Sequence, residues 1–298
     1  MGALVGDALG VPVEFSSRRD RDSDPVNDMR AFGTWNQPAG TWSDDGALLL
    51  CTAESLLENP SVDLAGQLYV RWKHEGHWAV RGKVFDIGNA TGAALGRIAA
   101  GTPAAVAGGT GDSDNGNGSL MRILPVALRF WNDSPEIVAD HAMGWSAITH
   151  RHARSQLACA CYCLVARHLM QGASPESAGS AGAETLGAIL RRFPAERPHF
   201  ERLLDGNLAH LSRQEISSGG YVIDTLEAAL WCLQQGGSFS EIVLRAVNLG
   251  GDTDTTGCVA GGLAGVWLGS DAIPNAWKDA LAKNPPVEEL IERLVGAS

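Results

Sequence analysis

Residues 248–257 read NLGGDTDTTG, and they lie between the apolar runs IVLRAV and CVAGGLAGVWLG. In this stretch Asp252 and Asp254 stand two positions apart beside threonine hydroxyls. Such groups are the hard oxygen ligands that Mg²⁺, Mn²⁺ and Ca²⁺ prefer, and the glycines let the backbone bend tightly near a ligand. The same residue types are also common in a polar turn that caps the next helix. The stretch alone therefore allows two interpretations, a metal-binding loop or an ordinary helix start.

The sequence on both sides of this stretch has a helical pattern. Apolar residues recur at three- to four-residue spacing through most of the chain, which indicates amphipathic helices. Convincing alternating strand patterns are missing, and no long Pro-, Gly- or Ser-rich linker divides the chain. We therefore predict an all-α fold that forms a single compact domain over residues 1–298. The predicted helices cover residues 47–58, 64–74, 119–131, 135–149, 154–171, 174–193, 221–235, 238–248, 255–268, 273–283 and 287–295.

Glycine is frequent inside two of the helical stretches, GGLAGVWLG at residues 261–269 and TGAALGRIAAG at residues 91–101. Inside a helix, Gly costs about 1 kcal/mol relative to Ala. We therefore predict that these glycines allow neighbouring helices to approach closely.

Composition restricts the classes of function. The chain has 23 Lys and Arg against 34 Asp and Glu, a net charge of −11, which argues against extended nucleic-acid binding because that needs clustered basic residues. This charge balance does not exclude binding of a nucleotide-sized ligand. No apolar run reaches the roughly 18 residues of a membrane span, and the N-terminus lacks the pattern of a signal peptide. The six cysteines contain no CxxC pair, so we interpret them as small buried hydrophobic residues. We expect a cytoplasmic monomer without membrane contact.

A second acidic cluster lies far upstream, in the sequence TWSDDG at residues 41–46. Ser43, Asp44 and Asp45 directly precede the apolar run ALLL. One interpretation is a helix cap, with Ser43 at the N-cap and the carboxylates facing the helix dipole. The other is a metal site shared with residues 248–257. Four clustered aspartates would repel one another unless cations neutralised them, and two Mg²⁺ ions about 3.5–4 Å apart would do so.

A glycine-rich loop lies between the two clusters, GNGSLMR at residues 116–122. Gly116 and Gly118 expose backbone N–H groups, Asn117 and Ser119 add polar side chains, and a predicted helix follows. This combination suits a phosphate-bearing ligand. A plain Gly-rich helix start remains the alternative.

Six motifs occur in one order along the chain. They are GDALGVPVEF (6–15), TWSDDG (41–46), DIGNAT (86–91), GNGSLMRILP (116–125), ITHRH (148–152) and GGDTDTTG (250–257). Together they resemble the ADP-ribosylglycohydrolase family, and the resemblance spans residues 6–268. It implies an all-helical fold around two divalent metal ions, Mg²⁺ or Mn²⁺, at helix starts and loops. The implied substrate is ADP-ribose joined to an acceptor, often an arginine guanidinium.

The resemblance also assigns roles to residues. It implies metal ligands at Ser43, Asp44, Asp45, Asp252, Asp254 and Thr255. It implies substrate contacts at Asp86, Asn115, Gly116, Asn117, Gly118, Ser119, Met121 and His150. Glu14 matches an acidic residue beside the metals that gates or polarises the site. From the residues alone, Asp86 is equally a loop aspartate, and a lone histidine such as His150 is more often structural. The chain departs from the family pattern at two positions where the family more often has Thr. Ser43 keeps the hydroxyl group, whereas Gly46 has no side chain that could act there.

The hypothesis from sequence is a metal-dependent hydrolase of an α-linked ADP-ribosyl bond, most readily ADP-ribosyl-arginine on a protein. Catalysis would involve Asp45, Asp254 and Glu14, with Asp45 or Asp254 accepting a proton from the attacking water. Two alternatives stay open. The same fold could act on another conjugate, such as ADP-ribosyl-serine, ADP-ribosylated nucleic acid or O-acetyl-ADP-ribose. The chain could also be a non-catalytic relative that binds ADP-ribose.

Overall fold

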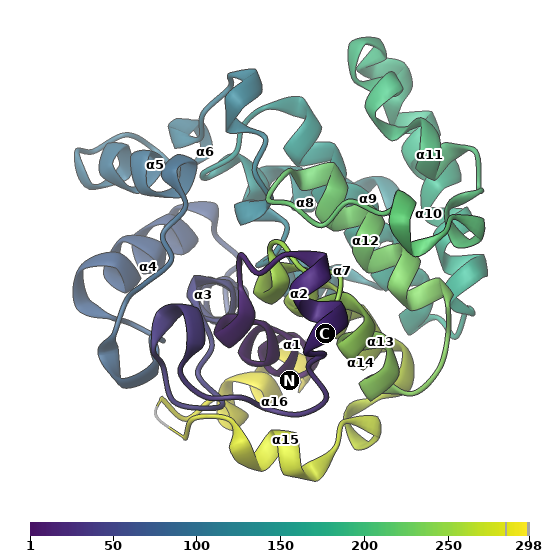
Figure 1. Ribbon diagram of the computed structural model, residues 1–298. Coiled ribbons are helices and arrows are strands. Elements are labelled where there is room, and N and C mark those ends of the chain that lie inside the picture. Colours follow the sequence, from purple (N-terminus) through teal and green to yellow (C-terminus); the bar gives the residue numbers. More distant parts are fainter. Residues whose placement is uncertain (284, 297–298) are drawn as a thin grey trace.

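The computed structural model describes residues 1–283 and 285–296, and these residues form helices joined by loops (Figure 1). The helices of the first half are α1 (Gly2–Gly10), α2 (Arg18–Ser23), α3 (Asp44–Ser55), α4 (Val62–Glu75), α5 (Asn89–Ala99), α6 (Ala104–Ala107), α7 (Leu124–Phe130) and α8 (Pro135–Ala147). Those of the second half are α9 (Ala153–Met170), α10 (Pro175–Ile189), α11 (Glu201–Leu204), α12 (Val222–Gln234), α13 (Phe239–Val247), α14 (Thr253–Leu268), α15 (Asn275–Ala280) and α16 (Glu288–Gly296).

Short 3-10 helices occupy many of the connections. They are η1 (Val11–Val13), η2 (Gly33–Trp35), η3 (Val80–Gly82), η4 (Asp112–Asp114), η5 (Asn117–Ser119), η6 (Leu190–Arg192), η7 (Pro194–Phe200), η8 (Leu208–His210), η9 (Arg213–Glu215) and η10 (Ser270–Ala272). Extended pairing in the described chain is limited to isolated bridges, such as the one between Gly116 and Tyr221. The predicted all-α fold is confirmed.

Several helix ends differ from the prediction for local reasons. Helix α3 begins at Asp44, earlier than predicted, because the Ser43 side chain accepts a hydrogen bond from Asp45 N and caps it. Helix α7 begins at Leu124, later than predicted, because the glycine-rich loop forms the 3-10 turn η5 first. Helix α15 covers only the middle of the predicted segment 273–283, since its N-cap is Pro274.

Helices α1 and α14 cross in the middle of the molecule (Figure 1). Their contact is lined with glycine: a Cβ on Gly257 would lie 2.5 Å from Gly6 O, and one on Gly261 would lie 2.5 Å from Gly2 O. The pairing order shows that the helices run antiparallel, so the end of α1 meets the start of α14. There, a Cβ on Gly10 would overlap the backbone of Asp254. The predicted close approach is therefore confirmed for α14.

The same prediction is wrong for α5. A Cβ on Gly96 would meet nothing within 4 Å, and one on Gly92 would make only ordinary contact with the Ile87 side chain. Helix α5 lies at the edge of the fold (Figure 1), where Thr91, Ala94 and Leu95 are its only buried residues. Its glycines are therefore not needed for helix packing.

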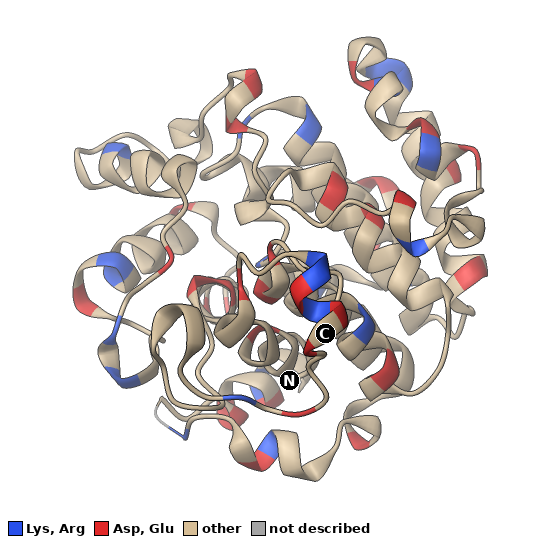
Figure 2. Ribbon diagram, in the orientation of Figure 1, with Lys and Arg blue, Asp and Glu red and all other residues tan. Residues whose placement is uncertain are grey.

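Two further features bear on the sequence predictions. All six cysteines are buried and free, as their apolar surroundings indicated. Within residues 1–283 and 285–296, no helix combines the length and apolarity that crossing a membrane requires. Lys and Arg are spread over several helices and form no continuous basic face in the view of Figure 2.

Candidate active site

The two acidic clusters meet where helices α3 and α14 begin. Asp44 and Asp45 form the first turn of α3, and Asp254 lies in the first turn of α14 after the N-cap Asp252. Thr255 Oγ1 donates a hydrogen bond to Asp45 Oδ1 at 3.3 Å, although the two residues are 210 positions apart. The helix-cap interpretation holds for Ser43, whose side chain caps α3, whereas Asp252 occupies the N-cap position of α14 without a side-chain cap hydrogen bond. Both clusters lie at helix starts that face each other, which is compatible with the metal-site interpretation.

The aspartates of this cluster are buried without compensating cations from the protein. Asp44, Asp45 and Asp254 are 5%, 1% and 0% exposed. Burial, reinforced by the neighbouring carboxylates, raises the pKa of all three well above the ordinary value. Asp45 Oδ2 and Asp254 Oδ2 have no hydrogen-bond partner. Buried unpartnered carboxylate oxygens are unfavourable unless a proton or a cation neutralises them.

Glu14 joins this cluster from the segment after η1. Its carboxylate oxygens and those of Asp252 and Asp254 include atoms that all lie within 4.8 Å of one another. Trp35 Nε1 donates to Glu14 Oε2 and Thr34 Oγ1 donates to Glu14 O, so the turn η2 holds this residue in place. Burial and the nearby Asp86 raise the pKa of Glu14 to about 9.

This donor set fits a divalent metal ion. Converging carboxylates and a threonine hydroxyl are the ligands of hard cations. The unpartnered oxygens of Asp45 and Asp254 supply the observation that favours such an ion, since the protein offers them no donor. A cation would remove the repulsion that raises the pKa of each carboxyl group.

The glycine-rich loop closes the site from the other side. Asn117 Nδ2 donates to Asp252 Oδ2 at 2.8 Å and to Thr225 Oγ1 at 2.9 Å, which ties the loop to the acidic cluster. Its backbone N–H donates to Gly220 O at 3.0 Å. The amide of Asn117 is therefore already engaged within the protein.

Two of the predicted contact residues lie behind the loop. Ser119 is fully buried, and its hydroxyl accepts from Ser146 Oγ at 2.9 Å. Asn115 accepts from Ser155 Oγ at 3.0 Å and donates to Asp112 O. Neither residue lines the pocket described next, so the structure places both where they support the loop rather than where they touch a ligand.

A pocket of about 290 Å³ connects the acidic cluster with the loop. Its walls include most of the predicted site residues, namely Glu14, Asp44, Asp45, Asp86, Gly116, Asn117, Gly118, Met121, His150, Asp252 and Thr255. Ser43 and Asp254 do not line the pocket, although a carboxylate oxygen of Asp254 lies within 4.8 Å of those of Glu14 and Asp252. The structure thus brings residues of all six motifs to one pocket, while their individual roles stay predictions.

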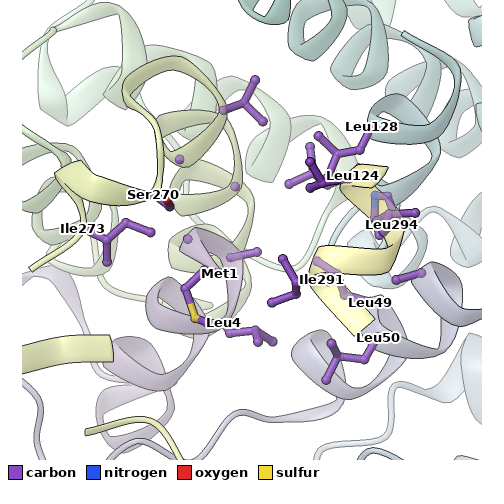
Figure 3. A pocket seen from close by; sticks show the side chains of 18 of the residues that line it. Met1, Leu4, Leu49, Leu50, Leu124, Leu128, Ser270, Ile273, Ile291 and Leu294 are labelled. Atoms are coloured by element: carbon purple, nitrogen blue, oxygen red, sulfur yellow. The ribbon is translucent and has the colours of Figure 1, made fainter. Parts of the chain in front are cut away.

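A second cavity, of about 340 Å³, is of a different kind. Leu4, Leu49, Leu124 and Ile291 project into it from four helices (Figure 3). Its lining holds no carboxylate and no basic side chain, so it lacks the groups that bind a nucleotide or a metal ion.

His150 lies beside the loop in an uncharged form. Burial lowers its pKa to about 3. Arg122 Nη2 donates to Thr149 Oγ1 at 2.8 Å, and Thr149 Oγ1 lies 2.7 Å from His150 Nδ1. When the Thr149 hydroxyl donates to Nδ1, the ring hydrogen is on Nε2, which faces Gly116.

Asp86 stands on the opposite wall in an unusual backbone conformation, with φ +60°. Burial and the charge of Asp252 raise its pKa to about 6. A non-glycine residue with positive φ is uncommon and often marks a functional site. This supports a site role over an ordinary loop aspartate.

Comparison with known proteins now decides the family. The protein-family model described as ADP-ribosylglycohydrolase matches residues 1–298. The chain belongs to the ADP-ribosylglycohydrolase family. A solved structure titled "ADP-ribosylglycohydrolase-related protein complex" shares 33% identity and a TM-score of 0.81, and the match covers 100% of this chain and 95% of that one.

Named relatives of this glycohydrolase match it over most of their length. ADP-ribosylarginine hydrolase Tri1 of Pseudomonas putida strain GB-1 is 35% identical over 299 residues, which cover 99% of this chain and 76% of that protein. ADP-ribosyl-[dinitrogen reductase] glycohydrolase of Rhodospirillum rubrum is 29% identical over 302 residues, covering 100% of this chain and 92% of that protein.

Sequence reasoning assigned no role to Asp7, which the structure places beneath the glycohydrolase site. Both carboxylate oxygens accept from Ser43 N at 3.0 Å, and Oδ2 also accepts from Gly46 N at 2.8 Å. Burial raises the pKa of Asp7 to about 7. The signal was present, because an aspartate inside the apolar helix GALVGDALG needs buried hydrogen-bond partners.

Proposed function

We propose that this glycohydrolase hydrolyses the bond between ADP-ribose and an arginine guanidinium on protein, with the help of divalent metal ions. The observation that carries the proposal is a pocket whose walls combine a glycine-rich loop with a cluster of buried, uncompensated carboxylates. Two relatives named ADP-ribosylarginine hydrolase, 35% and 32% identical over 99% of this chain, support arginine as the acceptor.

The proposed metal centre holds two ions, Mg²⁺ or Mn²⁺. The residues that would hold them are Ser43, Asp44, Asp45, Asp252, Asp254 and Thr255. When bound, such ions supply Lewis acidity, orient substrate oxygens and make a water molecule more acidic. Glu14 borders this centre, and the hydrogen bond from Trp35 holds its carboxylate there.

The loop and His150 would bind the diphosphate. Helix starts and glycine-rich turns offer backbone N–H groups to anions. His150 Nε2 carries a hydrogen in the arrangement described above and donates it without adding a permanent charge. Asn117, already bonded to Asp252 and Thr225, keeps the loop at a fixed distance from the carboxylates.

The proposed hydrolysis then needs one proton acceptor. Water adds its oxygen to the anomeric carbon of the ribose while the bond from that carbon to the guanidinium nitrogen breaks. Asp45 or Asp254 accepts the proton of the water, because both carboxylates lie buried in the acidic cluster at which the ribose would bind. Positive charge develops on the ribose ring in such reactions, and the surrounding carboxylates stabilise it.

A panel of conjugates tests the proposal. The purified protein is incubated with ADP-ribosyl-arginine peptide, ADP-ribosyl-serine peptide, ADP-ribosylated DNA and O-acetyl-ADP-ribose, each with Mg²⁺, Mn²⁺ or EDTA. We expect metal-dependent release of ADP-ribose from the arginine peptide at a rate above that of the others. Binding of ADP-ribose without release from any conjugate would show a non-catalytic relative instead. Faster release from another conjugate would reassign the acceptor.

A further inference from the structure

One aromatic ring lines the pocket, and two further rings pack in a row behind it. Phe15 lines the pocket and is 66% exposed. Its ring meets that of Trp35 edge-on, with centroids 6.3 Å apart, and Trp35 in turn packs against Phe85 with centroids 5.5 Å apart.

The backbone holds Phe15 in this exposed position. Its φ is +63°, a conformation that bulky residues rarely adopt and that persists only where surrounding contacts impose it. Phe15 N donates to Gly251 O at 2.7 Å, which fixes the residue to the loop before α14. The strained backbone conformation thus occurs at a residue, Phe15, whose side chain is exposed to solvent.

Trp35 supports Phe15 from behind. Its indole N–H is engaged by the Glu14 carboxylate, which fixes the plane of the ring. Phe85 immediately precedes Asp86, whose φ is also positive. Both outer rings are thus attached to residues of the acidic wall, Glu14 and Asp86.

The pocket brings the glycine-rich loop and His150 together with the carboxylates. In the proposed function the diphosphate lies on the loop and the ribose at the carboxylates, so the acceptor joined to that ribose must extend past the carboxylates. Phe15 follows Glu14 directly in the chain and lines the same pocket.

We propose that Phe15, supported by Trp35 and Phe85, forms the acceptor subsite, where its ring stacks against the planar guanidinium of the modified arginine. This assignment rests on the proposed function. A planar cation binds favourably to an aromatic face, and Phe15 lines the same pocket as Glu14, Asp86 and Asp252. Such a contact discriminates between acceptors without touching ADP-ribose itself.

Steady-state kinetics of four variants test the subsite. Phe15→Ala removes the ring, Phe15→Leu keeps apolar bulk without it, and Phe15→Tyr restores an aromatic face. Phe32→Ala is the matched control, because Phe32 is 58% exposed but does not line the pocket. We expect KM for ADP-ribosyl-arginine peptide to rise about 3- to 30-fold in the Ala and Leu variants, the range of a cation–π contact. The kcat should stay within about twofold, and the Tyr and Phe32→Ala variants should match the wild type.

The dissociation constant of ADP-ribose, measured on the same variants by calorimetry, distinguishes the loss of an acceptor contact from a general loss of ligand binding. It should not change, because the product lacks an acceptor. Equal weakening of ADP-ribose and peptide would show that Phe15 only holds the Glu14 segment, which overturns the subsite. An unchanged KM in Phe15→Ala overturns it as well. If the wild-type protein binds ADP-ribose but releases none from the arginine peptide, the proposed function fails, and the guanidinium assignment fails with it.

Discussion

Asp45 and Asp254 each carry one buried carboxylate oxygen that meets no donor. In a protein without a metal ion these groups are stable only when protonated, which is why burial raises their pKa so strongly. A divalent ion competes with those protons. The residues that the sequence identified as the chemical centre are therefore the residues that destabilise the metal-free fold.

Asp254→Asn should weaken metal binding while leaving the fold intact. The amide removes one charged ligand and part of the repulsion, so Mn²⁺ affinity should fall at least about 100-fold. The melting temperature of the metal-free variant should equal or exceed that of the wild type. Calorimetric titration with Mn²⁺ measures the first effect and thermal unfolding the second. Asp140→Asn is the control, because Asp140 is an exposed carboxylate on α8. An unchanged Mn²⁺ affinity in Asp254→Asn would remove this residue from the metal site.

Asp7→Asn should loosen the start of α3. The amide retains an accepting oxygen but turns an NH₂ group toward Ser43 N, so one buried hydrogen bond is lost at a cost of about 1–3 kcal/mol. Urea unfolding measures this loss. Asp63→Asn provides the comparison, since the exposed Asp63 accepts from Ala104 N at the start of α6 and should cost less than about 1 kcal/mol. Equal losses of unfolding free energy in the two variants would mean that the burial of Asp7 does not strengthen its hydrogen bonds.

At the scale of residues, the sequence identified the polar groups of the site more easily than the residues that surround them and hold them in place. Asp44, Asp252 and His150 were found because they occur in motifs, and the structure brings them to one pocket. Asp7 and Phe15 occur in motifs as well, but their roles depend on a hydrogen bond to a residue 36 positions away and on a positive φ. Neither property can be derived from the types of the neighbouring residues.

The contact between α1 and α14 positions Glu14 against Asp254. Because the helices are antiparallel and separated only by glycine, their ends meet at the acidic cluster. Gly6→Ala would push its Cβ into the Gly257 carbonyl, so we expect a loss of about 3 kcal/mol or more. Gly96→Ala on α5, where nothing lies within 4 Å, should instead stabilise by about 0.5–1 kcal/mol. Urea unfolding of both variants checks this contrast. A neutral Gly6→Ala would mean that the two helices separate without cost.

Helix starts and ends were predicted with unequal success. The pattern of apolar residues predicted the bounds of α9 and α12 to within a few residues, because long segments with helical periodicity are the clearest helix signal in a sequence. It misplaced the start of α7, because the conformation of residues 116–123 depends on the side-chain bonds of Asn117 to Asp252 and Thr225. Those partners come from distant segments of the chain.

For the whole molecule, the buried carboxylates determine how stability depends on pH. The pKa values of Asp86, Asp7 and Glu14 are raised to about 6, 7 and 9, against ordinary values near 4. The folded state therefore binds more protons than the unfolded state above pH 4. The stability that these bound protons contribute is lost as pH rises through the three raised pKa values. His150 acts in the opposite direction, but only below its ordinary pKa near 6.5.

We therefore expect the melting temperature of the metal-free protein to fall between pH 7 and pH 9. Saturating Mg²⁺ should reduce this fall, because the ion replaces the protons. Glu14→Gln should also reduce it in the metal-free protein, since Glu14 is the group whose pKa is raised to about 9. Differential scanning calorimetry at the two pH values checks each expectation. A metal-free wild type that is more stable at pH 9 than at pH 7 would contradict them.

The arrangement of the whole chain was predictable only through the family resemblance. Periodicity indicated helices, and the absence of linkers indicated a compact unit, but neither shows that α1 packs on α14 at the other end of the sequence. The order of six motifs carried that information, because it is shared with proteins of the same fold. The role proposed for Phe15, with Trp35 packed behind it, lay outside what those motifs could show.

Release of ADP-ribose from an ADP-ribosyl-arginine peptide, followed by mass spectrometry, tests the central claim most directly. The comparison uses the wild type and Asp254→Asn, each with Mg²⁺ and with EDTA. We predict release by the wild type with Mg²⁺, its loss in EDTA and its recovery when Mg²⁺ is restored, with no release by a folded Asp254→Asn variant. Release that is equal in EDTA, or equal in the variant, would contradict the proposed metal-dependent mechanism.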